Sequence, residues 1–369
     1  MPDNRIDIVV PVWNRPVETR NCLVSLVEHT PDSRLILVDN CSDRDTERML
    51  EEFAEALDVR VLLLRTTVNE GFVKAVNRGV ARSETPLVAV VRHNSRVMPG
   101  WLEPLLAFAD EEPSAGIVVP GFVDAGPRRR VSNGSPVVRG MELPAADFAA
   151  LMMRHSLFEQ IGGFNEELDG GEWCLKEFSR RACRAGFRTC AVPEGMVCRV
   201  EDVQFGSLSR RAEHQKSISS QFVAQWGTEC SFCLHLPRES DLSAFMVTFP
   251  VIIAAARQGH RITILAHARV ARDLLREGVH HRHRHVEVVA LPALMPARTV
   301  RQVLEGFAVP PTLVEVQKGT PCPGFTATMD FAEFTQMVRA TESAVYGRRL
   351  ESAPSPICPA GSGEPGRNA

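Results

Sequence analysis

Four short polar segments stand out because each directly follows an apolar run. Together they contain carboxylates, amides, hydroxyls and cationic side chains. Such groups can hydrogen-bond a base and a ribose or neutralise a phosphate. The segments are residues 11–15, 39–43, 65–71 and 92–95. They are candidates for a nucleotide pocket, with the alternative that they only form turns, which Asn, Asp, Ser and Gly also favour.

Strands and helices must bring these segments together. Apolar runs predict buried strands, and helical spacing of apolar residues predicts the helices between them. The strands are expected at residues 8–12, 34–39, 59–65 and 87–91, and the helices at 17–29, 45–57 and 70–81. This alternation indicates a parallel sheet with right-handed crossovers. Ligands bind beyond the carboxyl ends of such strands, which is where the polar segments lie.

The remaining chain predicts more of this domain and then a second α/β unit. A Gly-, Pro- and Arg-rich loop at 120–140 is followed by a helix at 172–185, a strand at 187–192 and a polar helix at 207–226. Further strands are expected at 231–236, 261–266, 286–291 and 312–316. Pro250 should kink or divide the apolar helix at 241–258. We therefore expect domains at 1–229 and 230–345, the second Rossmann-like but without GxGxxG, and a disordered tail at 346–369.

Composition excludes some classes of protein. The 369 residues carry a net charge of -3, which argues against broad electrostatic capture of nucleic acid. The longest apolar run, residues 245–256, is too short to span a bilayer, for which about 20 residues are needed. The N-terminus has no signal-peptide pattern, so we expect the ten cysteines to be reduced thiols in a cytoplasmic protein.

Two clusters of potential metal ligands have simpler interpretations. Cys230 and Cys233 form a lone CxxC without the second pair that a zinc site usually needs, so ordinary thiols are favoured over metal or redox work. The run HHRHRH at residues 280–285 could bind a soft metal or an acidic partner. Its position between a predicted helix and a predicted strand favours an exposed loop.

Several motifs, taken in order, resemble the family 2 glycosyltransferases, which have the GT-A fold. They are IVVPVWNRP at 8–16, LVDNCSD at 37–43, NEGFVKAVNRG at 69–79, PGWL at 99–102, GGFNEEL at 162–168, CRAGFRTCAVPE at 183–194 and the pair Trp226-Gly227. The resemblance covers about residues 4–230. It implies a GT-A Rossmann-like, mostly parallel sheet, with the smaller C-terminal α/β domain outside the resemblance.

The resemblance also implies a site for a nucleotide-sugar donor. Residues matching the family's motifs would line the base, the ribose and the diphosphate. They are Pro11, Trp13, Asn14, Arg15, Asp39, Asn69, Gly71, Asn77, Arg92, His93 and Asn94. Glycine lets a ligand or a neighbouring element approach the backbone closely. Asp39, Asn69 and Asn77 have the alternative of being turn or cap residues.

The loop expected to hold a divalent cation departs from the family pattern. Counting back from PGWL places Asn94 where the family has a metal-binding Asp, and residues 92–96 contain no carboxylate. Mg²⁺ prefers oxygen ligands that include carboxylates, so Asn94 makes a weak site for Mg²⁺ or Mn²⁺. Arg92, His93 or Arg96 could instead supply positive charge to the diphosphate. The alternative is that these arginines face solvent.

The residues expected to provide the catalytic base also differ from the family pattern. The family carries a Glu-Asp pair here, whereas this chain offers Glu177 by direct counting, or Glu172 if the register shifts by two residues. General base catalysis needs a carboxylate near the acceptor oxygen. Glu177 has Arg181 four residues on and could be a surface ion pair. We favour Glu172, with Glu177 second and neither residue as the remaining alternative.

The resemblance implies inverting transfer of a sugar from a nucleotide diphosphate to a hydroxyl acceptor. Surface polysaccharide or glycoconjugate synthesis is the expected setting, with a glycan or lipid-linked acceptor and peripheral association with the inner membrane face. One alternative is an inactive relative that binds a nucleotide sugar or acts as a scaffold, because the metal and base carboxylates are missing. Another is that the C-terminal domain is the active part.

Overall fold

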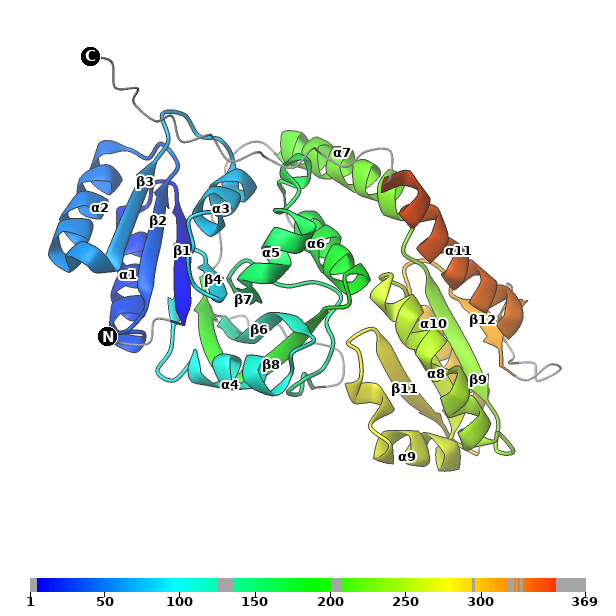
Figure 1. The fold of residues 1–369 in the computed structure, drawn as a ribbon. Coiled ribbons are helices and arrows are strands. Elements are labelled where there is room, and N and C mark those ends of the chain that lie inside the picture. Colours follow the sequence, from blue (N-terminus) through cyan, green and yellow to red (C-terminus); the bar gives the residue numbers. More distant parts are fainter. Residues whose placement is uncertain are drawn as a thin grey trace, which may run out of the picture.

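The computed structural model describes residues 5–124, 136–170, 172–200, 208–293, 296–316, 322, 324–325 and 328–349. Its first domain contains an eight-stranded sheet in the order β3-β2-β1-β4-β7-β6-β8-β5 (Figure 1). The strands are β1 (Ile6–Val12), β2 (Arg34–Asp39), β3 (Val61–Arg65), β4 (Leu87–Val91), β5 (Arg96–Val97), β6 (Ala115–Asp124), β7 (Ala150–Arg154) and β8 (Arg188–Arg199). The predicted strands β1 to β4 are confirmed and run parallel. β7 is antiparallel to β4 and β6, so the sheet is mixed beyond β4.

Helices cover both faces of this sheet. α1 (Pro16–His29), α2 (Arg44–Leu57) and α4 (Glu103–Glu111) pack on one face, where Leu23, Leu50 and Trp101 are fully buried. α3 (Phe72–Val80), α5 (His155–Ile161), α6 (Trp173–Arg184) and α7 (Leu208–Trp226) pack on the other, around Phe178 and Phe222. Two short 3₁₀ turns are η1 (Asp58–Arg60) and η2 (Glu166–Leu168). Burial on both faces explains why the parallel strands read as continuous apolar runs.

The second domain is a smaller parallel sheet in the order β11-β10-β9-β12-β13. Its strands are β9 (Ser231–Leu236), β10 (Arg261–His267), β11 (Val286–Leu291), β12 (Thr312–Glu315) and β13 (Thr328–Asp330). Its helices are α8 (Leu242–Arg257), α9 (Ala268–Arg276), η3 (Val279–His281), α10 (Pro296–Glu305) and α11 (Phe331–Arg349). Pro250 lies inside α8 without dividing it. α11 ends at Arg349, so the first residues of the tail predicted at 346–369 are helical. The rest of that tail lies outside the described residues.

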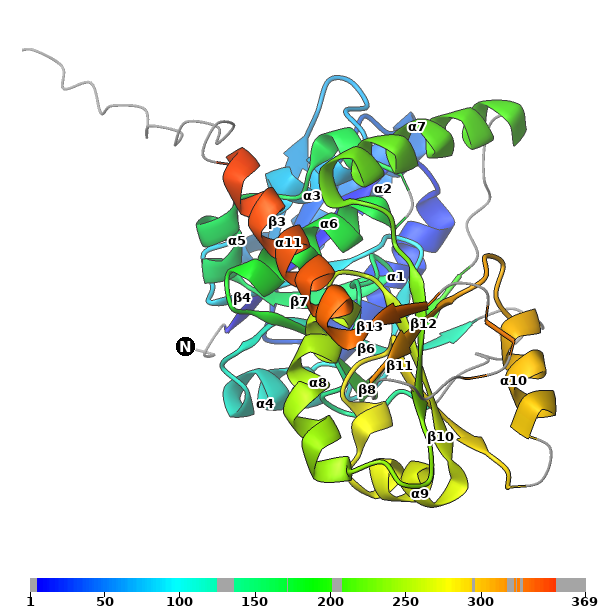
Figure 2. The same ribbon diagram turned by 90° about the vertical axis from the view of Figure 1, so that its right-hand side faces the viewer.

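Polar contacts join the two domains, which lie side by side in Figure 1 and one in front of the other in Figure 2. Glu142, in the segment before β7, accepts two hydrogen bonds from the Arg257 guanidinium at 2.6 and 2.7 Å. Its backbone N–H donates to the carbonyl of Arg282, and its carbonyl accepts from the N–H of Arg284. Glu229, just before β9, accepts from Arg180 of α6 at 2.6 Å.

The histidine run lies at this junction. His283 is only 1% exposed, and its Nδ1 accepts a hydrogen bond from the N–H of His285 at 3.0 Å. The expectation of an exposed loop is therefore wrong for His283, which forms an isolated β-bridge with Glu142. The described residues include no group of three or more His, Cys, Asp or Glu side chains placed to hold a metal ion.

Candidate active site

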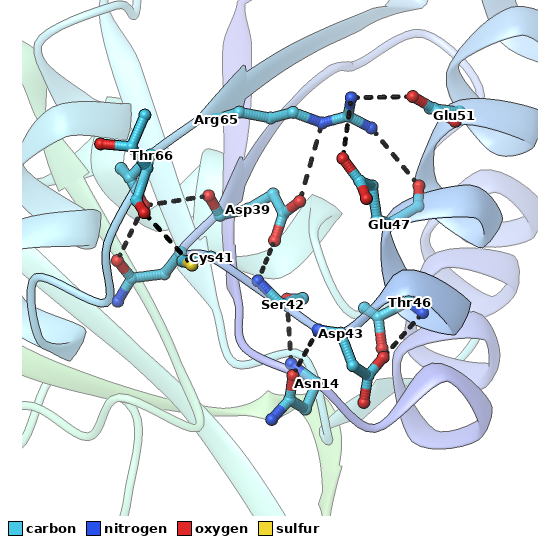
Figure 3. A network of polar contacts seen from close by, with 12 residues as sticks. Asn14, Asp39, Cys41, Ser42, Asp43, Thr46, Glu47, Glu51, Arg65 and Thr66 are labelled. Carbon is cyan, nitrogen blue, oxygen red and sulfur yellow. Dashed lines mark hydrogen bonds and ion pairs between the residues drawn. The ribbon is translucent and has the colours of Figure 1, made fainter.

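The loops after β1 and β2 are tied to each other by side chains that the sequence had singled out (Figure 3). The Asn14 Oδ1 accepts from the N–H of Asp43 at 2.7 Å, and the Asn14 N–H donates to Ser42 Oγ at 2.9 Å. The Asp39 carboxylate accepts from the Ser42 N–H at 3.0 Å and lies 3.7 Å from Arg65 Nε. These residues, at the carboxyl ends of β1 and β2, form a polar rim that consists of Asn14, Asp39, Ser42 and Asp43.

This rim contains backbone strain. Asn14, Arg15 and Cys41 have φ values of 58°, 60° and 61°, in the left-handed region that residues other than glycine rarely adopt. Each such residue costs about 1–3 kcal/mol and persists only where the surroundings hold it, commonly at functional sites. Trp13 stands beside them with 44% of its surface exposed. An exposed aromatic ring at this position can stack on a planar base.

Asn40 connects the third polar loop to the other two. Its Nδ2 donates to Asn69 Oδ1 at 3.0 Å and to the Gly71 carbonyl at 2.9 Å, while its Oδ1 accepts from the Glu70 N–H. Asn40 belongs to the polar segment 39–43 that the sequence singled out, although it was not among the residues assigned to the donor site. Asn77, which the resemblance assigned to the donor site, instead joins α3 to the backbone N–H and carbonyl of Phe164. Its amide is therefore used structurally.

The loop after β4 offers a cation but no set of metal ligands. Arg92 packs over the Phe72 ring at 5.0 Å and lines a cavity. His93 Nδ1 donates to the carbonyl of Pro11 at 3.2 Å. Asn94 is 3% exposed, and its Nδ2 donates to the carbonyl of Val200 at 3.3 Å. Asn94 offers a single neutral amide oxygen, and a loop without a carboxylate does not fit the oxygen-rich coordination that Mg²⁺ or Mn²⁺ requires.

The cavity beside Arg92 has a volume of about 540 Å³ and is lined by both domains. Asp169 lies in it, at the amino end of α3, where its Oδ2 accepts from the Val73 N–H at 3.3 Å. Burial raises the pKa of the Asp169 carboxyl, against the opposing effect of hydrogen bonds from the N–H groups of Val73 and Phe72. Sequence reasoning missed Asp169, although it directly follows GGFNEEL.

The two glutamates proposed as base lie in different environments. Glu172 lines the same cavity, and its exposed carboxylate is 3.0 Å from Lys176 Nζ. Glu177 is 1% exposed and accepts two hydrogen bonds from Arg181 Nε, at 2.7 and 2.9 Å. Arg181 also donates to the carbonyls of Ile161 and Gly163. Glu177 is not among the residues that line the cavity, and its geometry is that of a buried structural ion pair.

Comparisons with known proteins agree with this assembly of polar loops around a parallel sheet. Residues 7–162 match the model of the family described as glycosyl transferase family 2. This part of the chain is a family 2 glycosyltransferase domain. It contains the polar loops after β1, β2, β3 and β4, whereas Asp169 and Glu172 follow the matched residues.

Three similar proteins illustrate the relationship. Polypeptide N-acetylgalactosaminyltransferase 13 of Rattus norvegicus is 30% identical over 115 residues, which are 30% of this chain and 21% of the relative. Pre-mycofactocin glycosyltransferase of Mycobacterium tuberculosis is 28% identical over 207 residues, 49% of this chain and 41% of the relative. The crystal structure of S. aureus TarS 1–349 superimposes with a TM-score of 0.49 and 16% identity, covering 60% of this chain and 65% of that one. The chain thus spans about a fifth of the length of the first relative and about two fifths of the second.

Proposed function

We propose that this protein is a glycosyltransferase that moves a sugar from a nucleotide-diphosphate donor to a hydroxyl acceptor with inversion. The observation that carries the proposal is the placement of Asp169 and Arg92 in one cavity next to the polar rim. A carboxylate and a guanidinium are the two groups that such a transfer needs: one removes the acceptor proton, and the other compensates charge on the departing diphosphate.

The donor would bind along the rim after β1, β2 and β4. Trp13 would stack on the base. Asn14 would donate or accept hydrogen bonds at the base edge, and Asp39 would accept hydrogen bonds from the base or the ribose hydroxyls. Arg92 would face the diphosphate, because a guanidinium can bond two phosphate oxygens at once. In this proposal no divalent cation is needed, since the loop after β4 does not fit one.

Asp169 is the better placed base. Burial raises the pKa of its carboxyl above the usual 3.8, and a carboxylate with a raised pKa is a stronger base for proton transfer. In the step proposed, the acceptor oxygen attacks the anomeric carbon from the side opposite the diphosphate. The bond between that carbon and the diphosphate oxygen breaks, and the acceptor proton passes to Asp169. Glu172, exposed at the same cavity, remains the second candidate.

An inactive, nucleotide-sugar-binding relative is the second candidate function. It is favoured by one specific observation: Asp169 already accepts a hydrogen bond from the N–H of Val73 at the start of α3, so it also has a capping role.

Surface polysaccharide or glycoconjugate synthesis is the setting we propose for the active form. None of the helices in the described ranges has the length and hydropathy that a bilayer crossing requires.

A thermal-shift panel tests donor binding before any acceptor is known. UDP, dTDP, GDP and their common sugars are added to the protein, with Mn²⁺ and then with EDTA. A ligand at 100 times its dissociation constant adds about 2.7 kcal/mol of stability. We expect one nucleotide to stabilise the protein equally in EDTA, and Arg92→Ala to lose that stabilisation.

Arg96→Ala is the matched control, because Arg96 follows the same strand but lies outside the cavity that Arg92 lines. Equal loss in both variants would show that only general positive charge matters. Stabilisation that appears with Mn²⁺ and vanishes in EDTA would contradict the metal-free site. The absence of any nucleotide effect would refute the transferase proposal.

A further inference from the structure

A second cavity of about 590 Å³ adjoins the one that contains Asp169. Arg261 and His285 line both cavities. Arg261 is the first residue of β10, and His285 immediately precedes β11, so the cavities adjoin at the amino edge of the second sheet. The outer cavity is further lined by Met141, His280, Arg284, Glu287, Gln302 and Phe307. The two cavities are therefore neighbours on either side of Arg261 and His285, and together they are called the groove.

The two parts of the groove differ in charge. The inner cavity is lined by four carboxylates and by three cationic side chains, so that carboxylates outnumber cations by one: Asp147, Asp169, Glu172 and Glu229 against Arg92, Lys176 and Arg261. The outer cavity has the guanidiniums of Arg261 and Arg284 and the single carboxylate of Glu287. Within the described part of the chain, Arg261 forms no ion pair with a carboxylate, and its side chain is exposed. The outer cavity is thus suited to a ligand with negative charge.

Two histidines of the outer cavity have unused hydrogen-bonding capacity. The Nδ1 atoms of His280 and His285 are buried and lack a hydrogen-bond partner among the described residues. Burial lowers the pKa of His285 to about 4, so its ring is neutral at pH 7. A buried polar atom without a partner is unfavourable, and a hydrogen bond from a ligand hydroxyl would satisfy it.

We propose that the acceptor is an extended acidic oligosaccharide that occupies the whole groove. Its reacting hydroxyl lies in the inner cavity beside Asp169. An acidic group further along the chain lies against Arg261 and Arg284, and intervening hydroxyls bond to the histidines. This inference rests on the proposed transferase function and adds the acceptor class and the role of the second domain. Arg261 is then a specificity-determining residue.

Fluorescence anisotropy tests the groove directly. The probes are a labelled heparin-derived hexasaccharide, which is anionic, and labelled chitohexaose, which is neutral and of the same length. We expect the full-length protein to bind the anionic probe at least tenfold more tightly at low salt. Arg261→Gln should weaken that binding about tenfold, and Arg261→Lys should restore most of it, because the charge returns. Equal affinity for the two probes, or binding of neither, would overturn the proposal.

Arg272→Gln is the matched control, since Arg272 is exposed on α9 and lines neither cavity. An equal loss of binding in Arg272→Gln would show non-specific attraction and would overturn the proposal. The nucleotide thermal-shift panel is run on the same samples. Loss of anionic-probe selectivity with nucleotide binding intact refutes the groove alone, whereas loss of all nucleotide binding with the groove intact refutes the transferase function alone.

Discussion

Asp169 is a partly buried carboxylate and Glu177 a fully buried one, and their partners differ in kind. Asp169 is held by the backbone N–H groups at the start of α3 and opens into the cavity. Glu177 is held by the Arg181 guanidinium, whose own side chain is 5% exposed. A carboxylate whose oxygens are both bonded to a buried arginine is not available to an acceptor hydroxyl. The environment therefore separates a residue able to react from one that supports the fold.

Asp169→Asn should abolish most of the activity while stabilising the protein. Loss of a general base typically lowers kcat about 10²–10⁴-fold. Burial raises the folded-state pKa of Asp169 above its usual 3.8, so its charged form is unfavourable in the folded protein. This penalty is absent below pH 3.8 and grows as the pH rises through the raised pKa. We expect the variant to unfold at a higher temperature than wild type at pH 7, with the difference shrinking toward pH 3.

Release of nucleoside diphosphate from the donor and thermal unfolding between pH 3 and pH 8 measure the two effects. Glu172→Gln is the control, because Glu172 lines the same cavity but has an exposed carboxylate. A larger fall in kcat for Glu172→Gln than for Asp169→Asn would transfer the role of base to Glu172. A stability difference that grows toward low pH would contradict the stated effect of burial on Asp169.

Glu177→Gln should damage stability rather than chemistry. It leaves the Arg181 guanidinium buried without its carboxylate, and breaking such a pair costs about 3–5 kcal/mol. The same change at Glu172 disrupts an exposed pair with Lys176, worth about 1 kcal/mol or less. Urea unfolding of both variants gives the comparison, and kcat at 25 °C should stay near wild type for Glu177→Gln. Equal stability of the two variants would contradict the structural role of the Glu177 pair.

At the scale of the elements, local sequence patterns were informative where a strand and its neighbours are close in the chain. β1 to β4 and α1 to α3 could be predicted because each buried parallel strand is a continuous apolar run followed by an amphipathic helix. The antiparallel position of β7 between β4 and β6 could not be predicted, since the pairing of strands far apart in the chain produces no periodic pattern in the sequence. Asp169 was missed for the same reason: its partner Val73 is 96 residues away.

The turn before α3 is an element whose conformation fixes Asp169. Gly71 has a φ of +93°, and a Cβ there would lie 2.5 Å from Asp169 Oδ2. Gly71→Ala should therefore both strain the turn and displace the carboxylate. Gly162 has a φ of +78° but nothing within 4 Å of its Cβ position, so Gly162→Ala reproduces the strain alone. Comparing Gly71→Ala with Gly162→Ala therefore distinguishes the effect of backbone strain from the effect of displacing Asp169.

Both alanine variants should lose about 1 kcal/mol or somewhat more of stability, because alanine disfavours positive φ. Only Gly71→Ala should also lower kcat, by at least tenfold, since the base moves away from the acceptor. Nucleotide release and thermal unfolding, measured on both proteins, give the comparison. Equal kcat in the two variants would show that the placement of Asp169 by this turn does not matter for the reaction.

At the scale of the whole molecule, the inner cavity exists only where the two domains meet. Its floor and its candidate base come from the first domain, whereas Arg261 and His285 come from the second. Lys176 also contacts the segment that leads into the second domain, with its Nζ 3.1 Å from Glu229. The sequence does not predict the contact between the domains, because the contact depends on single Arg and Glu residues. In a sequence, such residues cannot be distinguished from ordinary charged residues of the surface. Docking of the domains is thus part of building the site.

Arg257→Ala should loosen that docking and open the groove. Glu142, whose side chain is 11% exposed, would keep only the longer contact to Arg188 at 3.8 Å. Stability should fall by about 2–3 kcal/mol, somewhat less than for a fully buried pair because Arg257 is partly exposed. Amide hydrogen exchange should accelerate at Glu142 and Arg284, whose N–H groups bond across the junction. Nucleotide binding should persist, since the rim after β1 and β2 lies within the first domain, while the anionic hexasaccharide should bind more weakly.

Arg276→Ala, which removes an exposed cation of α9, is the control. Unchanged exchange at those two amides would mean that Glu142 and Arg257 do not hold the domains together, and the groove would then have to be maintained by the contacts of Glu229 with Lys176 and Arg180.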